Sequence, residues 1–224
     1  MPGKTIALPL FPLNTVLLPG MTLPLRIFEQ RYLQMIEDCL GGDPVFGVLL
    51  IKEGHEVGEA AIPYEVGTTA RILSVERASP EELHIVTVGE ERFLLHSISH
   101  KSKPYLVGDV ELYPLEERET PRVAALLDAQ QILLAAYLEL ISQANGIDIQ
   151  LRRAVAGPVE MCYLVAALLQ VPLAVKQQIL AVEGLEEMMQ QEVSLLQAEV
   201  TALTVMLRGA GLFQDEDPSG LAVN

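Results

Sequence analysis

The hydrophobic positions of this chain change their spacing near residue 114. Before that point, apolar residues come in short runs separated by glycine, proline and charged residues, which is typical of β-strands. A helix signal interrupts these runs near Phe28. Several short antiparallel strands around one inserted helix predict a small β-barrel, because closure hides strand edges that would otherwise stay exposed. The runs predict strands at residues 22–27, 45–51, 70–75, 83–88, 92–98 and 105–113.

Four prolines mark the beginning of the chain. Pro9, Pro12, Pro19 and Pro24 lack a backbone N–H, so this segment is not expected to form a central strand. Pro19 and Gly20 together predict a turn before the next strand. We therefore expect short edge strands joined by turns in this part of the chain.

The second half of the chain has the composition and spacing of helices. Thr120 and Pro121 supply an N-cap and a first-turn proline for a helix that runs to about residue 143. An apolar stripe then runs along the last helix, with spacings of three and four residues. We expect this stripe to pack on the other helices or on the barrel, and the alternative is an intermolecular coiled coil. The later helices are predicted at residues 158–169, 172–183 and 185–207.

These elements predict an α+β fold, a small β-barrel with one inserted helix followed by an α-helical bundle. We divide the chain into a barrel domain at residues 1–117, a helical bundle at 118–212 and a flexible acidic tail at 213–224.

Charge and cysteine content narrow the classes of partner. The chain has 30 Asp and Glu against 15 Lys and Arg, a net charge of −15, and shows no basic stripe, so nucleic acid is not an expected partner. Cys39 and Cys162 stand alone, which predicts small buried side chains in a reducing, cytoplasmic protein rather than a disulfide or zinc site. Unbroken apolar runs such as 164–169 are shorter than the ~20 residues that cross a bilayer, so no membrane partner is expected.

Several short motifs follow one another in a recognisable order. The first is LPLFPL at 8–13, followed by PGM at 19–21, LPLRIFE at 23–29 and RY at 31–32. GTTARI at 67–72 and VGEERF at 88–93 come later, and KQQILAVE at 176–183 lies in the helical half. This series resembles the amino-terminal domain of the Lon family of ATP-dependent proteases.

The resemblance implies a PUA-like β-barrel and a role in substrate recognition without catalysis. The expected ligands are unfolded polypeptides or exposed apolar segments. One alternative is docking on a separately encoded ATPase or protease, and a second is the nucleic-acid binding of PUA domains, which the negative charge disfavours. The sequence leaves open whether the chain is a monomer or a weak homodimer.

The residues for ATP-dependent proteolysis are missing from this sequence. Gly3-Lys4-Thr5 lacks the upstream glycine loop of a Walker A motif, and the serine and lysine dyad of the family belongs to a domain that the chain does not contain. His96 and His100 would lie ~13 Å apart on a strand, too far for one metal ion. We therefore expect no catalytic residues, no cofactor and no metal.

One charged cluster interrupts the apolar sequence between the predicted strand at 22–27 and the helix. Arg26, Glu29 and Arg31 either brace this junction, by pairing with one another or with free carbonyls, or bind a polypeptide beside neighbouring apolar residues. Arg92 and Phe93 are expected to brace a turn and to fill the core, respectively. The candidate polypeptide-binding residues are Phe11, Met21, Arg26, Phe28, Glu29, Arg31 and Tyr32.

Overall fold

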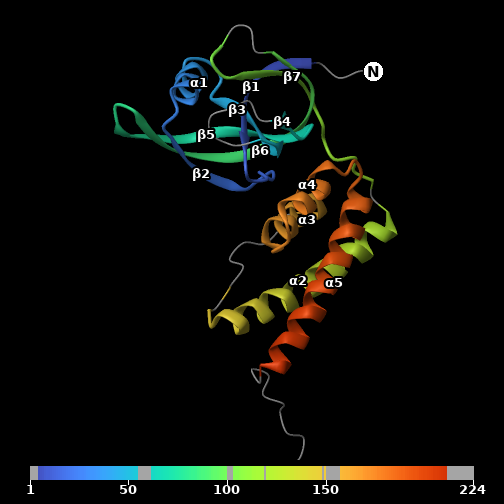
Figure 1. The fold of residues 1–224 in the computed structure, drawn as a ribbon. Helices are drawn as coiled ribbons and strands as arrows, with labels where there is room; N and C mark the ends of the chain where they lie inside the picture. Colours follow the sequence, from blue (N-terminus) through green and yellow to red (C-terminus); the bar gives the residue numbers. More distant parts are fainter. Residues whose placement is uncertain are drawn as a thin grey trace, which may run out of the picture.

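The structure, a computed structural model, combines a strand-rich half with a helical half (Figure 1). It describes residues 5–54, 62–99, 103–118, 120–147, 149 and 157–210. The strands in this part are β1 (Thr5–Leu13), β2 (Thr22–Ile27), β3 (Val45–Glu53), β4 (Ile62–Pro63), β5 (Val66–Ser79), β6 (Glu82–Ser99) and β7 (Leu106–Leu112). The helices are α1 (Gln30–Leu40), α2 (Pro121–Asn145), α3 (Pro158–Leu168), α4 (Leu173–Ala181) and α5 (Leu185–Gly209).

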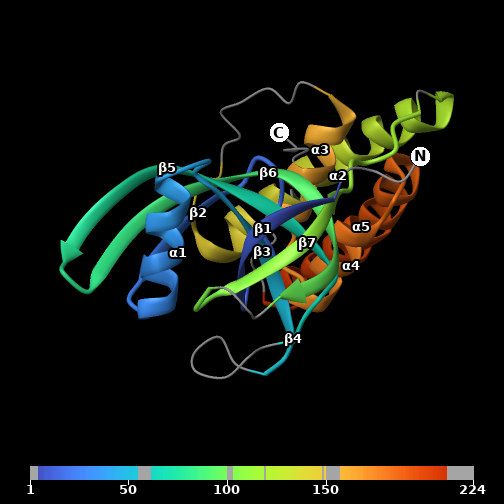
Figure 2. The ribbon, with the colours of Figure 1, turned by 90° about the horizontal axis from the view of Figure 1, so that it is seen from above.

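The main sheet closes on itself. Its strands pair in the order β1-β7-β6-β5-β3, and a parallel pairing between β1 and β3 completes the ring. β2 pairs with β6 outside this ring, and the β5–β6 hairpin projects from it beside α1 (Figure 2). The predicted strands are all present, although 83–88 and 92–98 are parts of the single long strand β6. The predicted tail and His100 lie outside the described residues.

The prolines of β1 do not divide this segment into short edge strands, contrary to what we expected from the sequence. The expectation of short edge strands is incorrect, because β1 is one continuous strand with neighbours on both sides. Its first part pairs with β7 as far as Leu10, and its last part pairs with β3 from Leu10 onward. Pro9 therefore has only a β7 partner and Pro12 only a β3 partner. Each half of β1 has one unpaired side, which is where proline is tolerated in a strand.

Phe93 fills the inside of the ring, as the sequence predicted. It is fully buried together with Leu10, Leu49 and other apolar side chains. A Cβ atom at Gly47 would come within 2.7 Å of the Phe93 ring atom Cζ, and one at Gly67 within 2.6 Å. The large ring thus fits only because the facing strands carry glycine at these two positions.

Helix α1 covers the outside of the ring with an apolar face. Its buried residues include Met35, Ile36 and Cys39, which pack with Phe46 of β3 and other core residues. Cys39 is a free, buried thiol, and so is Cys162 in α3. Both cysteines have the buried, unbridged state predicted from the sequence.

The helical half is built on α2 and α5, which run in the same direction away from the ring (Figure 1). Thr120 caps α2, because its hydroxyl accepts a hydrogen bond from the Val123 amide. The apolar stripe of α5 packs inside this half, as predicted, and its buried members are Leu185, Met189, Val193, Leu196 and Leu207.

Within the described residues, α2 alone has the length and composition of a membrane-crossing helix. Sequence reasoning passed over it because Arg122, Asp128 and Glu139 break its apolar runs. Core helices that never enter a membrane pass the same test, and α2 contributes Leu134, Tyr137 and other side chains to the core.

Candidate functional site

Two of the three aromatic candidates, Phe11 and Tyr32, belong to the core rather than to a surface. Their rings stack with centroids 4.0 Å apart, and both side chains are buried. This contact joins β1 to the first turn of α1. A ligand at the strand-to-helix junction would not reach either ring.

Arg26 is fastened to a strand rather than to its neighbour Glu29. Its guanidinium donates to both carboxylate oxygens of Glu82, with Nε–Oε1 and Nη2–Oε2 distances of 2.7 and 2.8 Å. Hydrogen bonds from Arg26 and His84 lower the pKa of Glu82 to about 2. Phe28 lies beside the guanidinium and is half exposed, so this pair remains at the surface.

Glu29 and Arg31 pair with each other, as one of the two structural alternatives predicted. The Nη2–Oε2 distance is 2.9 Å, and the Arg31 guanidinium lies over the Tyr32 ring. Met21 is partly buried between the two main apolar clusters. The seven candidates are therefore split between core, surface and braced positions, and none of them lines either of the two hollows described below.

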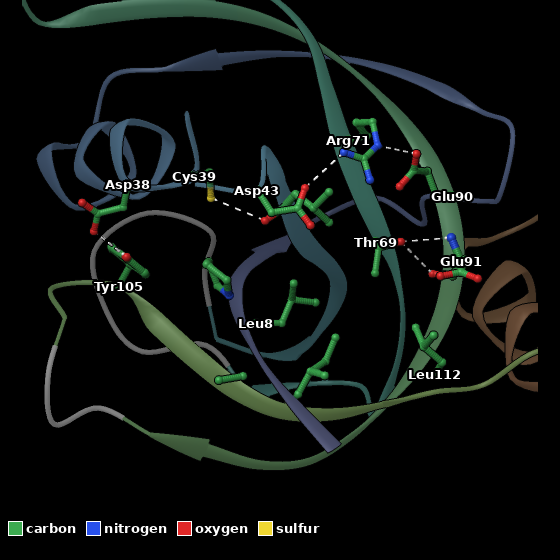
Figure 3. Close-up of a pocket in the computed structure, with 14 residues that line it drawn as sticks. Leu8, Asp38, Cys39, Asp43, Thr69, Arg71, Glu90, Glu91, Tyr105 and Leu112 are labelled. Carbon is green, nitrogen blue, oxygen red and sulfur yellow. Dashed lines mark hydrogen bonds and ion pairs between the residues drawn. The ribbon is translucent and has the colours of Figure 1, made fainter. Parts of the chain in front are cut away.

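One hollow on the described part of the molecule lies beside the first half of β1 (Figure 3). We call it the β1 cleft, and its volume is about 420 Å³. Its walls come from β1, β5, β6 and the end of α1, with Leu8 facing Thr69, Glu90 and Glu91 across the opening. The lining residues are Ile6, Ala7, Leu8, Pro9, Asp38, Cys39, Asp43, Val45, Thr69, Arg71, Glu90, Glu91, Tyr105 and Leu112.

A bulge in β6 shapes the far wall of the β1 cleft. The pairing of β5 with β6 shifts between Thr68 and Ala70, so that Glu90 and Glu91 face the single residue Thr69. The Thr69 hydroxyl accepts a hydrogen bond from the Glu91 amide and donates to the Glu91 carbonyl. Both glutamates are held by this bulge at the rim of the cleft.

The β1 cleft carries more negative than positive charge. Four of its lining residues are acidic, and Arg71 is its one basic lining residue among those described. Arg71 pairs with Asp43 and Glu90, while the side chain of Glu91 is exposed. Cations or basic side chains are favoured here over anions.

Asp38 ties the end of α1 to the segment before β7. Its carboxylate accepts hydrogen bonds from Lys103 at 2.8 Å, Tyr105 at 2.6 Å and Gln34 at 2.9 Å. These hydrogen bonds lower the pKa of Asp38 from 3.8 to about 2. The ionised form is therefore the one that the folded protein stabilises.

We expect Asp38→Asn to lower the melting temperature by a few degrees at neutral pH. Since the folded pKa lies below the unfolded one, the stabilisation is present above pH 3.8 and disappears as pH falls to about 2. Thermal melting of both proteins across the acid range should show the two curves converging. A difference that persists undiminished at the lowest pH would contradict this assignment.

A second hollow of about 230 Å³ adjoins the β1 cleft on the side of the helices. We call it the α3 cleft. Glu90, Glu91 and Leu112 line both hollows, so the two meet at the β6 bulge. Leu112 is 43% exposed there, and Val159 and Tyr163 of α3 form the opposite wall. The other lining residues of the α3 cleft are Pro19, Arg92, Pro114, Leu115 and Glu117.

Arg92 fixes the helical half against the ring. It is 98% buried, and its Nη1 donates to the carbonyls of Leu180 and Val182 at 2.7 and 2.6 Å. The guanidinium also lies over the Tyr113 ring, and its burial lowers the pKa of Arg92. Sequence reasoning gave Arg92 the role of bracing a turn, whereas it joins two halves of the molecule that are 88 residues apart or more.

Gln177 makes the second polar contact across this junction. Its side-chain amide donates to the Val66 carbonyl of β5 at 2.9 Å, and both groups are buried. Together Arg92 and Gln177 hold α4 against the ring. The motif at 176–183 was the sequence signal for this contact, although its partner strand could not be read from it.

The described residues show no site for a metal ion and no exposed thiol. They contain no cluster of three or more histidine, cysteine or acidic side chains placed to hold a metal ion. Cys39 and Cys162 are buried, and burial raises the pKa of each thiol, so neither is an activated nucleophile.

Comparison with known proteins agrees with the sequence motifs. The family described as the ATP-dependent protease La (Lon) substrate-binding domain matches residues 7–198. A Lon protease of Anaeromyxobacter dehalogenans is 29% identical over 194 residues, 84% of this chain but 23% of the relative. The chain thus spans about a quarter of that protein's length, and the match does not extend to ATPase or protease domains.

Solved structures show the same fold. A Lon N-terminal domain protein from Xanthomonas campestris has a TM-score of 0.63 and 26% identity, covering 84% of this chain and 98% of its own. The N-terminal domain of a Mycobacterium avium complex Lon protease has a TM-score of 0.67 at 20% identity, covering 86% and 98%. With the family match over residues 7–198, these similarities show that the chain belongs to the Lon substrate-binding domain family.

Proposed function

We propose that this chain is a non-catalytic module that binds unfolded polypeptides or exposed apolar segments in the β1 cleft and the adjoining α3 cleft. Membership of a substrate-binding domain family supports this role. The observation that carries it is the junction of the two hollows, where the apolar side chain of Leu112 is 43% exposed between them. Ile6 is also exposed in the β1 cleft, so apolar surface is available there.

The proposal also covers the type of barrel, the helical bundle, the domain boundary and the cellular location of the protein. Closure of the strand ring and insertion of α1 between β2 and β3 support a PUA-like barrel, with α2–α5 as a helical bundle. The boundary between residues 117 and 118 falls between β7 and α2. Two free thiols are consistent with a cytoplasmic location.

We expect Leu112→Thr to weaken binding of an unfolded protein about fivefold, because an exposed apolar contact is lost at the junction of the two clefts. The ligand is a reduced, carboxymethylated globular protein that carries a fluorescent label. Binding is followed by fluorescence anisotropy at a fixed salt concentration. The native form of the same labelled protein should not bind.

Ile132→Thr is the matched control for this experiment. Ile132 is 70% exposed on α2 and lines neither cleft, so its replacement should leave the dissociation constant unchanged. Equal weakening by both variants would place binding elsewhere on the molecule. No binding of any unfolded ligand by the parent protein would overturn the proposal and favour docking on a separate ATPase or protease.

A further inference from the structure

The first half of β1 has an open side that faces the β1 cleft. Residues Thr5 to Leu10 pair with β7, whereas pairing with β3 begins only at Leu10. In an antiparallel pair, alternate residues direct their N–H and C=O groups away from the partner strand. Between Thr5 and Pro9 those groups therefore point to the side of β1 on which none of the described strands pairs with it. Four residues of this stretch, from Ile6 to Pro9, line the cleft.

The chemistry around this open side favours basic over acidic ligands. Glu90 and Glu91 lie across the hollow from Leu8, and Asp38 and Asp43 also line it (Figure 3). Arg71 offsets part of this charge through its pairs with Asp43 and Glu90. Glu91 takes part in no ion pair among the described residues, so its carboxylate is available to a ligand.

We propose that the β1 cleft takes an extended polypeptide segment in which basic and apolar side chains alternate, added as a strand to the open side of β1. This inference rests on the proposed function and specifies its ligand. The main chain of the segment pairs with residues 5–9, and its apolar side chains lie on the same face as Ala7 and Pro9. Successive side chains of a strand point to opposite faces, so the alternate, basic ones lie on the face of Leu8 and reach Glu90 and Glu91 across the hollow.

Charge complementarity decides between this occupant and others. A phosphate backbone or an acidic peptide would meet the four carboxylates of the cleft and a chain with a net charge of −15. A helix would leave the polar groups on the open side of β1 without partners. An extended basic segment satisfies both the backbone groups and the charge.

The test compares three short labelled peptides in which leucine alternates with lysine, glutamine or glutamate. The lysine peptide should bind the parent protein most tightly and the glutamate peptide least. Glu91→Lys should weaken the lysine peptide about tenfold and strengthen the glutamate peptide. Circular dichroism checks that the variant is folded, and Glu91→Gln provides a smaller change at the same position.

Glu53→Lys is the matched control, because Glu53 is exposed at the end of β3 and lines neither cleft. Glu53→Lys changes the net charge of the protein by the same amount as Glu91→Lys. Its effect therefore measures how far the peptide is attracted to the acidic protein as a whole. Equal effects of Glu53→Lys and Glu91→Lys would overturn the inference.

Strand addition is tested with two further lysine peptides that carry N-methyl groups on one or the other set of alternate residues. Pairing uses the N–H groups along one side of the added strand, so one methylated peptide should lose binding and the other should keep it. Equal binding by both would overturn strand addition. If the unfolded protein binds at Leu112 but lysine peptides do not compete with it, the inference fails while the proposed function stands.

Discussion

Replacement of Arg92 by leucine is expected to lower the free energy of unfolding by about 3–5 kcal/mol, because two buried carbonyls lose a charged donor and each such hydrogen bond contributes about 1.5–3 kcal/mol. The substitution leaves the carbonyls of Leu180 and Val182 without their donor in the interior. It also removes the cation that lies over the Tyr113 ring. Guanidinium unfolding followed by circular dichroism measures the change.

The loss of local stability should be largest where Arg92 joins the ring to α4. Amide hydrogen exchange in α4 is expected to speed up more than exchange in β5 and β6, because Arg92 holds the end of this helix. Arg71→Leu is the control, since Arg71 is a partly exposed arginine with ion pairs only at the surface. Similar losses for both variants would show that Arg92 contributes no more than a surface charge.

Local signals in the sequence predicted most of the elements. The N-cap at Thr120, the prolines at the starts of α2 and α3 and the period of the α5 stripe each act within one or two turns of chain. Such signals depend on neighbours in sequence, so they could be read without knowledge of the fold. The burial of the α5 stripe follows from the same periodicity.

Contacts between distant segments could not be predicted in this way. Arg26 pairs with Glu82, and Arg92 with carbonyls at the end of α4, because strand register and helix docking bring them together. The two prolines in β1 were misjudged for a related reason. Proline is tolerated at these two positions because β1 stops pairing with β7 and begins pairing with β3 between them. Only the closed ring of strands defines where this change occurs.

The candidate site, like the fold, depends on contacts between distant segments that the sequence did not reveal. Sequence reasoning chose residues around α1 because charges interrupt apolar sequence there, but Phe11 and Tyr32 are core and Glu29 pairs with Arg31. The two clefts are lined by β1, β5, β6 and α3, which are remote in sequence. The signals that existed were the adjacent pair Glu90-Glu91 and the stretch near Leu8, which lie far apart in the sequence.

A buried carboxyl group in the helical half lines neither cleft. Glu192 of α5 has no exposed surface and accepts a hydrogen bond from the Gln130 amide of α2 at 2.6 Å. The Gln130 Nε2 atom also lies 3.7 Å from the Cys162 sulfur of α3. Burial raises the pKa of Glu192 well above 4.5, since no described cation offsets the loss of solvent.

Glu192→Gln is therefore expected to stabilise the protein by about 2 kcal/mol at mildly alkaline pH. This is about the free energy that a buried polar group costs when it lacks a hydrogen-bond partner. The amide keeps the oxygen that accepts from Gln130, and its nitrogen replaces Oε1, which has no partner. Gln130 Oε1 also lacks a partner, so the two amides can form reciprocal hydrogen bonds.

The pH dependence separates this account from a simple packing effect. Because the folded pKa of Glu192 is raised, the folded state retains a proton that the unfolded state releases, and stability falls as pH rises above 4.5 toward the folded pKa. The advantage of Glu192→Gln should accordingly grow with pH and be smallest below 4.5. Denaturant unfolding at several pH values measures it, with Glu187→Gln on the exposed side of α5 as a control that should change little. A gain for Glu192→Gln that is the same at every pH would show that the pKa of this carboxyl group is not raised in the folded protein relative to the unfolded chain.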